Sequence, residues 1–184
     1  ENLLRIEALL DNYDSLAVES ERAIALFPMQ PMPYYFNGFA SYMLKRYPEA
    51  IASLRKGVKL IASEPRLSAD FYGMIGDANH AAGNDAEAFE AYESALKIVP
   101  DYALVLNNYA YYLSLKGENL AKASEMAGKA IAIEPANASY LDTYAWVLYK
   151  QGDYSGALEY IEKAMQVNTE DSATLLGHYG DILY

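Results

Sequence analysis

Residues 157–164 read ALEYIEKA, a stretch bounded by alanine in which the apolar residues have helical spacing. The same design occurs as ASEMAGKA at residues 123–130 and as AFEAYESA at residues 88–95, so the copies are separated by 34 and 35 residues. Self-similarity at a period of this length is typical of helical arrays, in which every unit is one supersecondary element. The stretch therefore predicts stacked units of about 34 residues.

Prolines at near-regular intervals mark the junctions between these units. Pro28, Pro65, Pro100 and Pro135 are 37, 35 and 35 residues apart, and proline is common just beyond the end of a helix. The spacing predicts one array: a partial repeat at 1–28, four repeats at 29–65, 66–100, 101–135 and 136–169, and the first helix of a further repeat at 170–184. Extra residues between 58 and 62 are expected to change the local angle between repeats.

Small residues recur at fixed places in each predicted hairpin. Side chains this small allow two helix axes to approach closely, while bulky neighbours fill the grooves. We expect them at helix contacts, in the first helix (Gly38, Gly76, Ala110, Ala145, Gly180), at the start of the second (Ala50, Ala88, Ala123, Ala157) and seven residues later (Gly57, Ala95, Ala130, Ala164).

A turn signal separates the two helices of each hairpin. Glycine after the last helical residue supplies a left-handed backbone, and the Asn or Asp beside it is expected to cap the next helix. The turns are predicted at residues 46–48, 83–85, 116–119 and 151–154.

Seven spaced positions of one repeat carry a family resemblance: Tyr72, Ile75, Gly76, Ala88, Tyr92, Ala95 and Pro100. The pattern resembles the tetratricopeptide repeat (TPR) family, with Tyr72 where the family has tryptophan and Asn79 where it has tyrosine. The local sequence of residues 140–165 resembles that of TPR proteins from bacteria. The resemblance implies an all-α fold, a right-handed α-solenoid or superhelix of stacked antiparallel helix hairpins.

The resemblance also implies that the first helix of each repeat lines a concave groove. The positions that it assigns to binding a peptide or partner are Tyr35, Phe39, Tyr42, Asp77, His80, Asn107, Asn108, Tyr111, Asp142, Trp146 and Tyr149, with Asp70, Ser114, Lys150, His178 and Asp181 beside them. Such an aromatic and acidic lining suits an extended peptide or a partner helix that carries apolar anchors and some Lys or Arg.

Many of the 18 tyrosines must instead belong to the core. Those beside the small packing residues, Tyr92, Tyr109 and Tyr144, are expected to be buried, whereas Trp146, Tyr111, Tyr42 and Phe39 are expected to be exposed in the groove. The TPR subfamily that grips carboxylate tails uses Lys, Arg and Asn in the groove. No such cationic clamp can be assembled here, which argues against an adaptor for acidic C-terminal tails.

Composition excludes several partner classes. The hydrophobic fraction of 53% supports a continuous core, and the net charge of −11 repels nucleic acid. Apolar stretches fall short of the roughly 18 residues that a membrane span needs. The chain has no cysteine, so disulfide usage does not indicate its compartment, and both the cytoplasm and the cell envelope are possible locations. We expect the chain to be part of a longer protein.

The sequence contains no pattern typical of catalysis. His80 and His178 lie in different repeats without a metal-ligand partner at a fixed spacing, and no glycine-rich phosphate loop occurs. Asp70, Asp77 and His80 share a helix face that a solvated groove explains, and Glu87, Glu90 and Glu93 are interpreted as a solvated outer face. We expect no enzyme activity, no metal and no cofactor.

The leading hypothesis is therefore an interaction scaffold that holds a protein or peptide. The alternative is a non-catalytic TPR arm of a larger multidomain enzyme, or of a cell-envelope or secretion assembly. RNA binding is disfavoured because the predicted lining contains essentially one cation, Lys150. Self-association through uncovered end repeats is also open.

Overall fold

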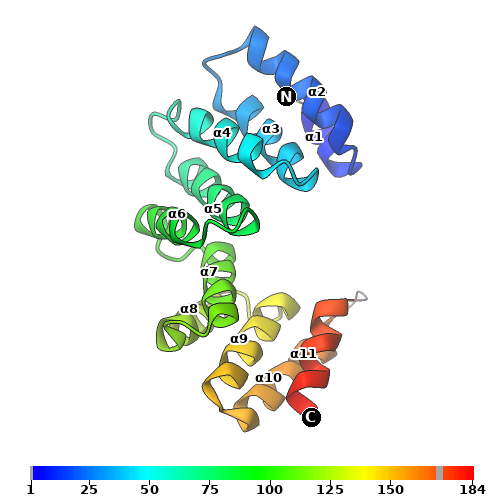
Figure 1. The fold of residues 1–184 in the computed structure, drawn as a ribbon, viewed down its shortest axis with the longest axis vertical. Helices are drawn as coiled ribbons and strands as arrows, with labels where there is room; N and C mark the ends of the chain where they lie inside the picture. The colour runs from blue at the N-terminus through cyan, green and yellow to red at the C-terminus, as the bar shows by residue number, and fades with distance from the viewer. Residues whose placement is uncertain (1, 169–171) are drawn as a thin grey trace. The chain divides into compact units, whose positions relative to one another are not determined.

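The computed structural model describes residues 2–168 and 172–184, which form eleven α-helices and no strand (Figure 1). The helices fall into two compact units, residues 1–100 and residues 101–184. This confirms the all-α class and the hairpin design that the repeated stretches predict.

The N-terminal unit contains six helices arranged as three hairpins. Their bounds are α1 (Asn2–Leu9), α2 (Tyr13–Leu26), α3 (Pro31–Met43), α4 (Tyr47–Val58), α5 (Pro65–Ala81) and α6 (Asp85–Ile98). The first helices α1, α3 and α5 contact one another in succession, while α2 and α4 each pack between consecutive first helices. Two apolar clusters hold the stack, one around Leu16 and Phe36 and one around Leu54 and Phe71.

The C-terminal unit repeats this arrangement with five helices. They are α7 (Ala103–Lys116), α8 (Leu120–Ile133), α9 (Ala138–Gln151), α10 (Tyr154–Val167) and α11 (Ala173–Leu183). Helix α9 contacts both α7 and α11, so the first helices again form one layer. The core of the unit gathers around Leu141, Ile161 and Leu175.

The predicted small positions lie at helix contacts, with one exception. Ala88 and its equivalents Ala50, Ala123 and Ala157 are fully buried. A Cβ atom on Gly76 would collide with the Tyr92 ring, so that ring packs directly on the α5 backbone. The exception is Gly180, which is exposed and where an added Cβ atom would meet no heavy atom within 4 Å. No second helix pairs with α11 in a hairpin within the described residues, so the expected contact at Gly180 is absent.

The predicted left-handed glycines occur in three hairpin turns, but only some of the predicted Asn and Asp caps form. Gly83, Gly117 and Gly152 have φ angles of 81°, 68° and 84°, the left-handed conformation that ends a helix. The Asp153 carboxylate accepts a hydrogen bond from the Gly156 N–H and caps α10. Asn84 does not cap α6 as expected.

Two further residues at helix ends lie outside the predicted turns. Asn137, at a junction between repeats, caps α9 by accepting hydrogen bonds from two backbone N–H groups. In the turn before α4, where glycine is absent, Lys45 takes the left-handed backbone with φ 60°.

The repeat boundaries stay a prediction. Pro65 begins α5, a position where proline costs nothing because the first N–H of a helix has no intrahelical partner. Thr169, which closes the last full repeat, lies outside the described residues. Across residues 2–168 and 172–184, no helix is both long enough and apolar enough to cross a membrane.

Candidate functional site

In the N-terminal unit, the predicted groove residues of α3 and α5 form an aromatic and acidic patch. Tyr35 is half-buried and packs edge-on against Phe71, with ring centroids 5.1 Å apart. Burial, and next the Asp70 and Asp77 carboxylates, raise the pKa of Tyr35 to about 12. The phenol therefore remains a hydrogen-bond donor at any physiological pH.

Tyr42 and Phe39 continue the patch along α3. Both are half-buried; Tyr42 lies 5.9 Å from the Tyr47 ring, and Phe39 packs edge-on against Tyr13 at 5.8 Å. Burial, followed by the Asp77 carboxylate, raises the pKa of Tyr42. The sequence predicts that Tyr42 and Phe39 are exposed. In the structure they are only partly exposed, because each ring packs against another aromatic ring.

Asp77 and His80 both make contacts inside the hairpin. The Tyr92 hydroxyl donates a hydrogen bond to Asp77 Oδ1 at 2.5 Å, and His80 Nδ1 lies 2.8 Å from Asp85 Oδ1. These contacts link α5 to α6, so part of the polarity that the sequence assigns to the groove also stabilises the hairpin. The two side chains stay partly accessible.

In the C-terminal unit, Trp146 is at the centre of the predicted site and is only 7% exposed, which corrects the expectation of an exposed indole. Its ring stacks on His178 with centroids 4.0 Å apart and on Tyr149 at 5.2 Å. The Lys150 ammonium lies 4.3 Å from the centroid of the indole, within cation–π range. Contacts between α9 and α11 thus bury Trp146, which the sequence predicts to be exposed.

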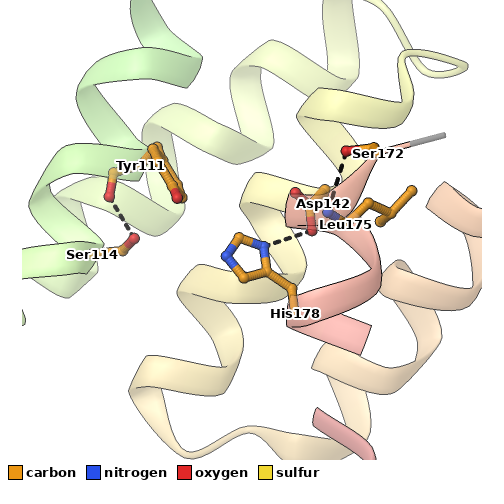
Figure 2. A network of polar contacts seen from close by, with 6 residues as sticks. All are labelled: Tyr111, Ser114, Asp142, Ser172, Leu175 and His178. Atoms are coloured by element: carbon orange, nitrogen blue, oxygen red, sulfur yellow. Dashed lines mark hydrogen bonds and ion pairs between the residues drawn. The ribbon is translucent and has the colours of Figure 1, made fainter. Parts of the chain in front are cut away.

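Asp142 fixes the histidine of this stack, as Figure 2 shows. His178 Nδ1 lies 2.9 Å from Asp142 Oδ1, and both side chains are about nine-tenths buried. The Tyr111 ring from α7 lies 6.0 Å from the imidazole. Burial, and next the Asp142 carboxylate, raise the pKa of Tyr111. Three first helices of this unit therefore meet at one cluster.

Two buried polar atoms on these helices have no hydrogen-bond partner. They are the indole Nε1 of Trp146 and the side-chain oxygen Oδ1 of Asn107, which is 7% exposed. The Asn107 amide donates to the Asn108 side-chain oxygen at 3.2 Å. Leaving such a group unsatisfied costs about 1–3 kcal/mol, so an orphan donor and an orphan acceptor on neighbouring helices require an explanation.

Sequence reasoning missed the packing between repeats. It placed His178 and Lys150 beside the groove, but it did not anticipate that both rest on the indole of Trp146. The sequence does contain a signal for this contact, because Trp146, Lys150 and His178 all lie on the first helices of two consecutive repeats. Within the described residues, no group of three or more His, Asp or Glu is arranged to hold a metal ion.

Comparison with known proteins agrees with this architecture. Residues 39–184 match the family model described as tetratricopeptide repeat. A curated TPR repeat-containing protein of Pseudomonas aeruginosa is 33% identical over 67 residues, which are 36% of this chain and 11% of that protein. The chain thus matches only a small part of its relative's length.

Solved structures show the same fold at low sequence identity. A thermophilic TPR protein of Thermus thermophilus matches 99% of this chain and 96% of its own with a TM-score of 0.76 at 22% identity. The crystal structure of MamA matches 91% and 95% with a TM-score of 0.73 at 21% identity. YrrB, a TPR protein described as having an unusual peptide-binding site, matches 96% and 88% with a TM-score of 0.68 at 16% identity. The repeated hairpins and the match over most of the sequence establish that this chain belongs to the tetratricopeptide repeat family, whose members are typically protein-interaction scaffolds.

Proposed function

We propose that the chain is a non-catalytic scaffold that binds a peptide or partner helix on its layer of first helices. The observation that carries the proposal is the cluster of Trp146, Tyr149, His178 and Tyr111, with two unsatisfied polar atoms among its helices. Aromatic residues bury a large area at low entropic cost, which makes them the usual anchors of interfaces.

The orphan polar atoms fit the chemistry of a peptide backbone. An N–H group of a bound chain would satisfy the Asn107 oxygen, and a carbonyl would satisfy the Trp146 indole. Both atoms are covered in the free protein, so binding requires neighbouring side chains to move first. Lys150, which is exposed and flexible, is the side chain over the indole whose movement costs least.

The charge of the lining favours a partner with apolar anchors and some basic residues. Asp70 and Asp77 add carboxylates to the N-terminal patch, and Asp142 adds one to the C-terminal cluster. The net charge of −11 extends the same preference to the whole chain and opposes nucleic acid.

The test is a selection of displayed random peptides against the purified chain, followed by affinity measurements on the enriched sequences. We expect aromatic or leucine anchors with Lys or Arg, and a loss of about tenfold in affinity for Tyr149→Ala. Tyr160→Ala is the matched control, because Tyr160 is also half-buried in this unit but lies on the second helix α10. Enrichment of acidic peptides, or equal losses for the two variants, would contradict the proposal.

Two of the hypotheses raised by the sequence remain proposals. If the full-length protein carries a catalytic motif elsewhere, the array is the interaction arm of an enzyme rather than a free scaffold. Self-association through the end helices is supported by exposed apolar side chains there, with Leu9 83% exposed near one end and Leu176 53% exposed near the other. Sedimentation of the chain over a concentration series tests this second hypothesis.

A further inference from the structure

The N-terminal unit carries a hollow of about 360 Å³, whose lining comes from α5, α6 and the C-terminal end of α4. Helices α4 and α6 both pack on α5 (Figure 1) but do not contact each other within the described residues. Residues of α5 form part of its floor, and the side chains of α4 and α6 form its two edges. The volume is at the small end of the range for ligand sites, enough for one or two large apolar side chains.

Two side chains of the hollow's floor are smaller than their equivalents in the C-terminal unit. Ile75 precedes the packing residue Gly76, and Ala91 lies three residues after Ala88. At the equivalent positions of the C-terminal unit, Tyr144 precedes Ala145, and Tyr160 lies three residues after Ala157. Those two tyrosine rings pack edge-on with centroids 4.7 Å apart. The two junctions thus differ in side-chain size at this pair of positions.

Opposite charges line the two edges of the hollow. Arg55 of α4 and Lys59, the residue that follows α4, form the basic edge, and Glu87 and Glu90 of α6 form the acidic edge. No ion pair engages any of these four side chains within the described part of the chain, even though opposite charges face the same space. The glutamates that the sequence assigns to plain solvation therefore border a concave surface.

The equivalent positions of the C-terminal unit carry fewer charges. Gly128 and Ala132 stand five and nine residues after Ala123, where Arg55 and Lys59 stand after Ala50. On α10, Glu159 is retained at the position of Glu90, but it pairs with Lys163. The charge pattern of the hollow is therefore a property of the N-terminal junction, in which the basic pair and the acidic pair occur together.

We propose that this hollow, which we call the α4–α6 hollow, docks an amphipathic helix of another protein. The partner inserts an apolar ridge, presents carboxylates to Arg55 and Lys59, and presents Lys or Arg to Glu87 and Glu90. The charges on each edge are three or four residues apart, the spacing at which a facing helix presents successive side chains on one face. The lining of the hollow shares no residue with the aromatic and acidic patch of α3 and α5 or with the Trp146 cluster, so the proposal can be tested independently of the function proposed above.

The probes are synthetic helical peptides of about 20 residues, long enough to be helical in isolation when rich in alanine. Each has a leucine or phenylalanine ridge at helical spacing. One series carries Glu along one edge and Lys along the other, a second carries Lys on both edges, and a third carries Glu on both. Binding to the chain is measured by fluorescence anisotropy of the labelled peptide at low and physiological salt.

We expect the mixed-edge peptide to bind at least about fivefold more tightly than either uniform peptide. Ala91→Tyr, which introduces the side chain that the other junction already tolerates, should weaken binding about tenfold or more. Arg55→Glu should weaken it about fivefold, whereas Lys56→Glu should change it less than about twofold. Lys56 is the matched control because it is exposed on the same helix but does not line the hollow.

A reversal of preference gives the sharpest test. With Arg55→Glu and Lys59→Glu together both edges become acidic, so the peptide with Lys on both edges should become the tightest binder. These two residues lie at the surface, so circular dichroism should show an unchanged fold. Binding that ignores Ala91→Tyr, or a peptide preference that the double variant leaves unchanged, would overturn the proposal. Self-association of the chain that Ala91→Tyr abolishes would overturn it too, by assigning the hollow to a second copy.

Discussion

The imidazole of His178 stacks on the indole of Trp146, with ring centroids 4.0 Å apart and an interplanar angle of 14°. Trp146 belongs to α9 and His178 to α11, so the stack joins the first helices of two consecutive hairpins. Asp142, one turn before Trp146 on α9, holds the same imidazole through Nδ1. The geometry makes specific predictions about stability and binding.

Trp146→Ala should destabilise the chain by about 3–5 kcal/mol, because it removes a large buried ring. Trp146→Phe should cost much less, about 1 kcal/mol, since it also removes a buried N–H that has no partner. Urea denaturation followed by circular dichroism measures both. Equal losses for the two variants would show that the indole N–H is satisfied in solution. If a partner accepts from that N–H, Trp146→Phe should also weaken peptide binding.

Asp142→Ala should cost about 1–3 kcal/mol, because it leaves the buried His178 ring without its hydrogen-bond partner. His178→Ala removes the other half of the contact and part of the stack on Trp146. The double variant should lose less than the sum of the two single losses, since the second substitution removes an interaction that is already broken. A double-mutant cycle from urea denaturation gives this coupling; strict additivity would refute the contact.

Two glycine-to-alanine substitutions should have opposite effects. Gly76→Ala should destabilise by about 1–3 kcal/mol, because its Cβ atom would collide with the Tyr92 ring. Gly180→Ala should stabilise by about 0.5–1 kcal/mol, because the surrounding space is open and alanine is the better helix former. Thermal and urea unfolding of the pair provide an internal control. Destabilisation by Gly180→Ala would mean that another part of the protein packs on α11.

The phenol of Tyr35 should make stability depend on alkaline pH. Its pKa is raised from 10.0 to about 12, so the folded state holds the proton more tightly than the unfolded state does. The stabilising contribution is fully present below pH 10.0 and is lost as pH rises through about 12. Tyr35→Phe has no proton to lose. Its urea midpoint should therefore fall less steeply over this interval than that of the natural chain, and parallel curves would contradict the raised pKa.

The sequence predicts the scaffold well because the scaffold depends on local spacing. The position of Ala88 and the close approach of Tyr92 to Gly76 follow from helical periodicity and side-chain size, both of which a single repeat displays. The left-handed glycines follow for the same reason, since each turn is decided by a few adjacent residues. Such features are decided by nearby residues and need no tertiary information.

The candidate site is harder to predict because it depends on contacts between repeats. The burial of Trp146 depends on His178, which lies 32 residues later in a different hairpin. The α4–α6 hollow is lined by Ala91, whose equivalent in another repeat is the much larger Tyr160, and the sequence of one repeat alone does not display this difference. Only a comparison of equivalent positions across the repeats, with their packing known, reveals either feature.

The chain contains a single tryptophan, and its ring is the one stacked on His178. Ultraviolet emission excited at the red edge of indole absorption therefore comes from this cluster alone, without any label. A partner that displaces the imidazole or Lys150 changes the wavelength and intensity of that emission. Occupation of the α4–α6 hollow, whose lining contains no indole, does not change them directly. The protein thus carries an optical reporter that distinguishes its two proposed surfaces.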